Sequence, residues 1–122
     1  MAKGNNQKFK FARLCSIMLE KTDEEHPMTL PQIQAELEKY EITSERKSLY
    51  KDFQDMQDEF GIDLIKNQVG RETYYYVGSR DFELAEVKLL IDAVQSSRFV
   101  SQAKSRELIA KIKKLVSEHQ AK

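Results

Sequence analysis

The stretch that decides the fold is residues 44–77, SERKSLYKDFQDMQDEFGIDLIKNQVGRETYYYV. In its first half, apolar side chains recur every three or four residues, which is the spacing of one helical face. Gly61 then supplies the residue type that most often follows the last turn of a helix. Beyond it lie two short runs rich in β-branched and aromatic residues, 62–67 and 73–77, with Gly70 between them. The pattern therefore predicts a helix over residues 44–60 followed by a β-hairpin. The apolar stripe of this helix consists of Leu49, Phe53, Met56 and Phe60.

Two further helices are predicted upstream, over residues 7–21 and 30–40. Thr29 is a suitable N-cap for the second, and Pro31 is tolerated in its first turn. A two-stranded hairpin alone is marginal in water, so one side of the predicted hairpin is expected to pack on the helices. The order helix, helix, helix, hairpin predicts a winged helix-turn-helix domain over residues 7–78. The apolar stripes are Phe11, Leu14, Cys15 and Met18 in the first helix and Leu30, Ile33, Leu37 and Tyr40 in the second.

The last third of the chain predicts two more amphipathic helices, over residues 83–97 and 102–118, with Ser101 as the cap of the second. A domain of about 75 residues does not need them for its own core. The expected fold class is therefore mainly α with a small β-hairpin, in which residues 79–120 form a two-helix extension. A second chain would cover the apolar surface that this pair leaves open, so we expect a homodimer through residues 83–118.

Composition disfavours several classes of protein. Of the 122 residues, 40% are hydrophobic and 33% are charged, which indicates a folded domain. No apolar run approaches the roughly 20 residues of a membrane span, and the first residues lack the apolar segment of a signal peptide. The single cysteine, Cys15, cannot form an internal disulfide, which fits a reducing compartment. We therefore expect a cytoplasmic protein that does not contact membranes.

An enzyme is the least favoured functional class. His26 and His119 have no acidic partner at ligand spacing, and the sequence has neither a glycine-rich phosphate loop nor a cysteine pair. Cys15 falls on an apolar helix face and is interpreted as a small buried hydrophobic residue, with a nucleophile as the alternative. The acids after residue 51 are interpreted as a solvated helix face, with a metal site as the alternative. We expect no catalytic residue, no metal and no cofactor.

Charge is segregated along residues 44–60. Residues 44–51 carry Arg46, Lys47 and Lys51 against Glu45, a net charge of +2, whereas residues 52–59 carry four acids. This order opposes the helix dipole, which favours acids early and bases late by about 0.3–1 kcal/mol each. Recognition helices place their N-terminal half in the major groove, where bases meet phosphates. We therefore predict DNA binding by this helix, with a random charged surface as the alternative. The candidate contacts are Ser44, Arg46, Lys47, Ser48, Tyr50 and Lys51 in the helix, Lys66 and Arg71 in the hairpin, and Lys3, Lys8, Lys10 and Arg13 as further bases near the N-terminus.

Residues 28–37 and 42–56 resemble the winged helix-turn-helix of bacterial WYL-domain transcriptional regulators, which are related in this part to the DeoR group. The family pattern in the third helix is a serine, polar or basic residues, an apolar residue, Tyr or Arg, a base, Asp and an apolar residue; residues 44–53 read SERKSLYKDF. The wing ending in YYYV (74–77) and the following FELAEV (82–87) are also similar to this family. The resemblance extends over about residues 9–117.

The resemblance implies a dimeric transcriptional regulator that binds double-stranded DNA through a recognition helix at about residues 44–60. In that family the two trailing helices lead into a C-terminal WYL domain thought to sense a ligand. Because this chain ends at Lys122, residues 79–120 are expected to be either a dimerisation element or the linker to an absent WYL domain, and no effector is implied.

A protein–protein interaction module without nucleic-acid binding is the alternative function. The 20 Lys and Arg residues balance the 20 Asp and Glu residues, so net charge favours no polyanionic partner. The acidic second half of the third helix also favours this alternative.

Overall fold

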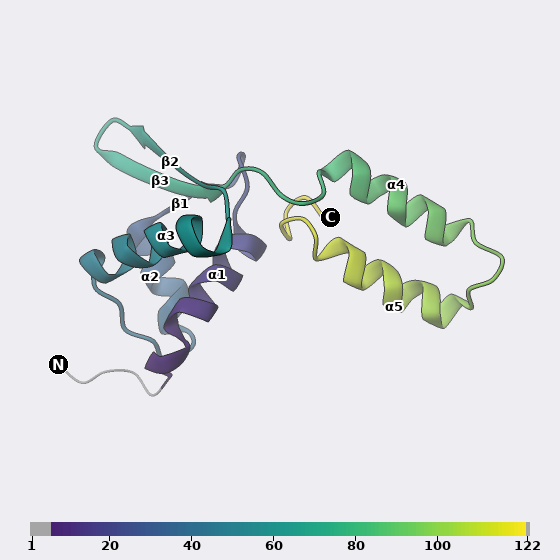
Figure 1. Ribbon diagram of the computed structural model, residues 1–122, viewed down its shortest axis with the longest axis horizontal. Helices are drawn as coiled ribbons and strands as arrows, with labels where there is room; N and C mark the ends of the chain where they lie inside the picture. The colour runs from purple at the N-terminus through teal and green to yellow at the C-terminus, as the bar shows by residue number, and fades with distance from the viewer. Residues whose placement is uncertain (1–5, 122) are drawn as a thin grey trace.

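The computed structural model describes residues 6–121. Figure 1 shows a body, formed by the helices and the small sheet of residues 7–77, from which a helical hairpin projects. The chain is mainly helical with a small antiparallel sheet, as predicted. The elements in chain order are the short 3₁₀ helix η1 (Gln7–Phe9), α1 (Lys10–Lys21), β1 (Met28–Thr29), α2 (Leu30–Glu38), α3 (Arg46–Phe60), β2 (Leu64–Val69), β3 (Glu72–Val77), α4 (Leu84–Gln95) and α5 (Gln102–Lys113).

Local signals fix the start of α2 and the end of α3, whereas the start of α3 departs from the prediction. Thr29 and Gln32 form a capping box at the start of α2, and α3 ends at Gly61, whose φ of 64° is left-handed. However, α3 begins at Arg46 with Glu45 as its N-cap, and not at residue 44. The preceding loop is held extended because the Gln7 amide bonds to the backbone of Thr43 and the Gln34 amide donates to the Ser44 carbonyl.

The sheet contains a strand that the sequence pattern did not predict. Strands β2 and β3 pair through a two-residue turn that begins at Gly70, whose φ is 63°, and β1 pairs with the other edge of β3. Strand β1 has only two residues, directly before the cap of α2, so it is too short to display a period. Tyr75 faces the helices and is 4% exposed, with its ring centroid 4.7 Å from that of Phe53.

One apolar core joins the three helices to the sheet. It contains most of the predicted stripes, and Leu14, Met18, Ile33, Leu37, Leu49 and Met56 are fully buried. Two stripe residues were wrongly expected inside. Phe60 is 66% exposed and rests against Phe11 at the edge of the core, whereas Tyr40 lies beyond the end of α2 with its ring stacked on Arg13.

The arm, α4 with α5, projects from the body as an antiparallel hairpin (Figure 1). Ser101 caps α5 as predicted, accepting a hydrogen bond from the Lys104 backbone. The last predicted helix is shorter than expected, since α5 ends at Lys113 and not near residue 118. Beyond it the chain turns back to the body, where the Glu118 N–H donates to the Glu20 carbonyl at 2.8 Å. This tertiary bond takes the place of a further helical turn.

A buried polar contact fastens the returning segment to the body. Ser117 is fully buried and its hydroxyl donates to the Asp23 carboxylate, which is 3% exposed. Asp23 also accepts a hydrogen bond from His26, whose ring stacks on that of His119 at 3.9 Å between centroids. Burial alone raises the pKa of Asp23, but the hydrogen bonds from Ser117 and His26 outweigh it, so that the pKa lies below its ordinary value.

Arg80 anchors the other segment that connects the arm to the body, which runs from β3 to α4. Its guanidinium donates to the carbonyl oxygens of Leu19, at 2.9 Å, and Thr22, at 2.6 Å, at the C-terminal end of α1. These carbonyls would otherwise lack partners at the helix end. Lys21 adds an ion pair with Glu118 at 3.1 Å. Both segments that connect the arm to the body are therefore anchored at the same end of α1.

Replacing Asp23 with alanine is expected to lower the free energy of unfolding by about 1–3 kcal/mol at pH 7, because the buried Ser117 hydroxyl loses its acceptor. The folded pKa of Asp23 lies below its ordinary 3.8, so its contribution is present above that pH and is lost as pH falls through the folded pKa. Denaturant unfolding from pH 7 to pH 2.5 should show the two proteins converging. The exposed neighbour Glu24→Ala is the control; an equal loss there would contradict the assignment.

Candidate nucleic-acid interface

The bases in the first half of α3 lie on its solvent side. The buried stripe Leu49, Phe53 and Met56 packs on the core, which turns Lys47 and Lys51 outward at 100° per residue. Arg46, Lys47 and Lys51 are all exposed. Within residues 6–121, no carboxylate pairs with Arg46 or Lys47, so both charges are available to an external partner.

Within the described residues, Lys51 is the base of this group that forms an ion pair with an acidic side chain. Its ammonium lies 2.8 Å from the Asp55 carboxylate, one helical turn further on. That hydrogen bond raises the pKa of Lys51 above its ordinary value. The Lys51 side chain is 74% exposed, so water screens the pair and the ammonium can exchange Asp55 for another anion.

The hydroxyl-bearing candidates differ in their accessibility. Ser48 is exposed and its oxygen accepts a hydrogen bond from Lys10 at 2.8 Å, which leaves its own proton free to donate. Tyr50 is 44% exposed. Ser44 does not join them, because its hydroxyl is buried and has no hydrogen-bond partner within the described part of the chain.

The basic residues near the N-terminus are mostly engaged within the body. Lys10 forms an ion pair with Asp52, and both side chains are largely buried. Arg13 lies over the Tyr40 ring, 4.0 Å from its centroid, and Lys8 lies over Phe9. Lys3 falls outside the described residues. Sequence reasoning missed the Lys10–Asp52 pair because nothing local signals a contact across 42 residues.

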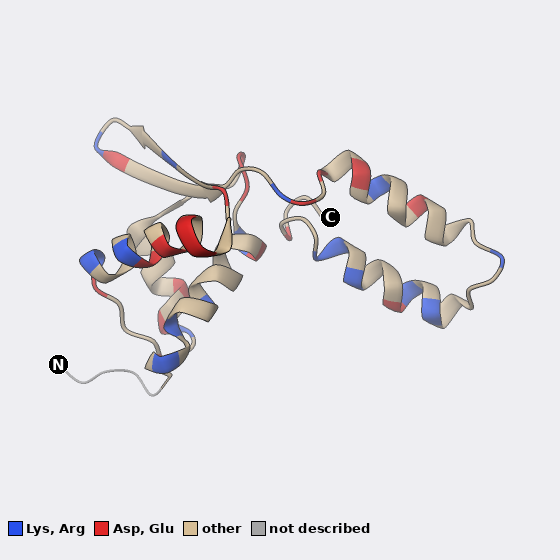
Figure 2. Ribbon diagram, viewed as in Figure 1, with Lys and Arg blue, Asp and Glu red and all other residues tan. Residues whose placement is uncertain are grey.

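The acidic half of α3 is also largely paired. Asp52 binds Lys10, Asp55 binds Lys51, and the Gln54 amide donates to Asp58 at 3.0 Å. Figure 2 shows Lys and Arg at the start of α3 and Asp and Glu along its remainder. The two halves therefore present surfaces of opposite charge, as the sequence predicted.

The hairpin places its two candidate bases differently. Lys66 pairs in register with Tyr75 and shares its face, so its side chain points toward α3. Arg71 occupies the exposed turn, next to Glu72 (Figure 2). Lys66 thus lies beside the α3 surface, whereas Arg71 marks the far end of the hairpin.

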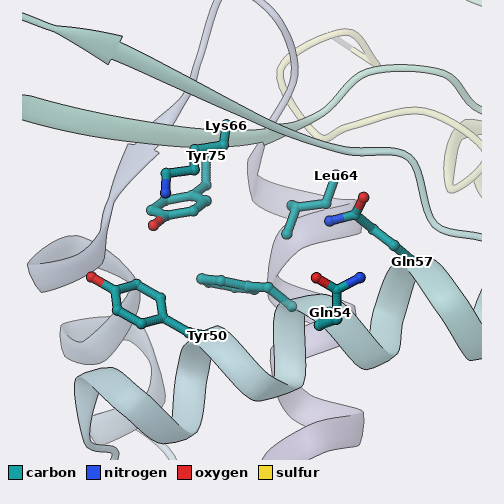
Figure 3. Close-up of a pocket in the computed structure, with 7 residues that line it drawn as sticks. Tyr50, Gln54, Gln57, Leu64, Lys66 and Tyr75 are labelled. Carbon is teal, nitrogen blue, oxygen red and sulfur yellow. The ribbon is translucent and has the colours of Figure 1, made fainter.

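An open pocket of about 200 Å³ lies between α3 and the hairpin (Figure 3). Phe53, Leu64 and Tyr75 supply its apolar part, and Lys66 contributes an ammonium on the hairpin side. Tyr50, Gln54 and Gln57 line it from α3, since their i, i+4 and i+7 spacing aligns them on one face. Neither glutamine was predicted as a site residue. The spacing from Tyr50 and the alternation that turns Lys66 toward the helix are signals that could have identified them.

The chemistry of this surface suits a polar, anionic partner. Glutamine amides both donate and accept hydrogen bonds, as base edges require, and the ammonium groups attract phosphates. By contrast, burial and the nearby Asp52 charge raise the pKa of the Cys15 thiol, which keeps it protonated at neutral pH. Within residues 6–121, no group of three or more His, Cys, Asp or Glu side chains is placed to hold a metal ion.

Comparison of the chain with protein-family models, with curated proteins and with solved structures finds no match in any of the three. None of the helices within residues 6–121 combines the length and the apolar character needed to cross a bilayer.

Proposed function

We propose that this chain binds double-stranded DNA through α3 and acts as a transcriptional regulator, or as the DNA-binding part of one, in the cytoplasm. In this proposal the body is a winged helix-turn-helix in which β2 and β3 form the wing. The observation that carries the proposal is the exposure of Arg46, Lys47 and Lys51 in the first half of α3, with two of the three charges unpaired within the described residues. The resemblance to WYL-domain regulators supports the same function.

The first half of α3 would enter the major groove. Its bases and the Ser48 hydroxyl would contact phosphates, which supply most of the affinity and make binding weaken with salt. Lys66 and Arg71 on the wing would reach the neighbouring backbone or the minor groove. The acidic side chains of residues 52–59, most of them held by contacts within the chain, would stay away from the duplex.

Sequence preference would come from the amides beside the pocket. Gln54 and Gln57 lie one and two turns beyond the bases on the side of α3 that faces the wing. A glutamine amide can make a bidentate contact with adenine, and each such pair contributes about 1–3 kcal/mol of discrimination against the wrong base.

A homodimer through residues 83–118 would present two copies of α3 to the same duplex. A twofold axis would relate the two helices, and successive major grooves on one side of DNA are about 34 Å apart. The proposed operator is therefore a palindrome with two half-sites.

The second candidate is a protein–protein interaction module. The balance of 20 bases and 20 acids and the four acids in residues 52–59 favour it. A mobility shift with random duplex at low salt distinguishes the two, because phosphate contacts alone produce binding under those conditions.

The double variant Lys47→Ala with Lys51→Ala is expected to weaken duplex binding severalfold and to reduce the slope of log affinity against log salt by about 2, since each phosphate contact contributes about 0.9. Both side chains are exposed, so the melting temperature should not change. Lys104→Ala with Lys111→Ala removes two exposed bases from the arm and is the matched control. Equal binding by both double variants would reject α3 as the DNA-binding element.

Replacing Gln54 and Gln57 with alanine is expected to leave binding to random duplex nearly unchanged while lowering the preference for a selected operator by about tenfold or more. Selection from random duplexes followed by competition binding measures both quantities. Gln95→Ala, on the exposed surface of α4, serves as the control. A fully retained preference in the Gln54 and Gln57 variant would show that other residues read the bases.

A further inference from the structure

Helix α4 carries many more apolar residues than it buries within one chain. Its sequence is LAEVKLLIDAVQ, in which eight of the twelve residues are apolar, yet Val87 is the only buried one. Leu89 is 71% exposed and Leu90 is 36% exposed. A helix that is apolar around most of its circumference is normally buried on more than one side. The arm as it stands covers only one side.

The covered side is the contact with α5. Leu84, Val87, Ile91 and Val94 are the buried or half-buried residues of α4, and at 100° per residue they form a single stripe. Ala85, Leu89 and Ala93 form a second row on the opposite side of the helix, and all three are exposed. The second row combines two small residues with a leucine, so another helix could approach it closely.

Helix α5 offers no comparable surface. Its outer side carries Lys104, Glu107 and Lys111, which interact with one another along the helix at 3.5–3.6 Å. Figure 2 shows that the charged residues of α5 are mostly Lys and Arg, and that α5 carries more charged residues than α4. Of the two helices of the arm, α4 therefore carries the more extensive open apolar face.

The charged residues beside this face could pair with the same residues of a second copy of the chain. Lys88 and Asp92 lie on the same flank of the Ala85–Leu89–Ala93 row, one turn apart. Both are exposed, and neither forms an ion pair or a side-chain hydrogen bond within residues 6–121. When two identical helices pack antiparallel about a twofold axis, the same flank of each helix faces its partner. Residue i of one copy then lies opposite residue j of the other when the sum of i and j equals a constant that the position of the axis sets. A twofold axis near residues 89 and 90 therefore sets Lys88 of each copy opposite Asp92 of the other.

We propose that α4 is a dimer interface, in which two copies of this chain pack antiparallel through the Ala85–Leu89–Ala93 row and exchange two Lys88–Asp92 ion pairs. Such an interface is isologous and closed, so it yields a dimer and not a filament. The two α5 helices lie on the outside of a four-helix arrangement. The inference deepens the homodimer of the proposed function by naming its surface, its direction and its charge pairing.

The antiparallel direction has a consequence for DNA binding. Each body joins the N-terminal end of its own α4, a helix about 18 Å long at 1.5 Å per residue. The two bodies therefore extend from opposite ends of the α4 pair. Two copies of α3 separated in this way can reach separate half-sites, which a parallel pair would bring together at one end.

The ion pairs are tested with the charge variants Lys88→Asp and Asp92→Lys in sedimentation equilibrium without DNA. The wild-type chain is expected to dimerise, and each single variant to dimerise about tenfold or more weakly because two attractive contacts become repulsive. An equimolar mixture of the two variants should form heterodimers as tightly as the wild type, since both pairs are then restored. The chain carrying both substitutions should also recover. A monomeric wild type at high micromolar concentration, or a mixture no tighter than its components, overturns the proposal.

The apolar row is tested with Leu89→Glu, which is expected to abolish the dimer while helicity is retained. Val69→Glu is the matched control, because Val69 is also largely exposed, at 60%, but lies on the hairpin. A dimer that survives Leu89→Glu overturns the proposed surface. Binding of the Leu89→Glu monomer to a half-site duplex is measured separately, so that failure of the DNA-binding proposal is distinguished from failure of the dimer.

Discussion

The packing of one side of α3 against the core is the constraint on which the remaining arrangement depends. Leu49 and Met56 are fully buried, and Phe53 stacks at an angle on Tyr75 from the sheet. These contacts fix the rotation of the helix about its axis. Lys47 and Lys51 then face solvent, and Tyr50, Gln54 and Gln57 face the hairpin. A rotation by half a turn would bury Lys47 without a partner, together with the Lys51–Asp55 pair, which is strongly unfavourable.

The junction at the end of α1 plays a similar role for the arm. Asp23, Ser117 and Arg80 satisfy buried or half-buried polar groups of both connecting segments at one place. Loss of one partner leaves another without a hydrogen bond, so this contact is more sensitive to change than an exposed ion pair. Because the arm meets the body mainly here, the direction of the proposed dimer relative to the DNA-binding surface depends on this junction.

Periodicity predicted most of the fold because most of its signals are local. The stripe of α3, the stop at Gly61, the capping of α2 by Thr29 and the hairpin turn at Gly70 each rest on neighbouring residues. The features it missed are tertiary. Strand β1 exists only because β3 lies beside it, and α5 ends early because the chain turns back to Glu20 and Asp23.

The same division holds for the candidate site. The outward direction of Lys47 and Lys51 follows from helix geometry and could be predicted. The burial of the Ser44 hydroxyl and the pairing of Lys10 with Asp52 could not, because both depend on how distant segments meet. Gln54 and Gln57 could be predicted only in part. Their helical spacing is visible in the sequence, but the pocket that they line forms only when the hairpin packs beside α3.

DNA binding through α3 is tested most directly by an NMR titration of the ¹⁵N-labelled chain with a duplex selected from a random library. Amide shifts and line broadening are expected to concentrate on residues 46–57 of α3 and on Lys66 to Arg71 of the hairpin, with little change in α2 or in the outer face of α5. Perturbations centred on the arm, or none at duplex concentrations that saturate binding, would contradict it.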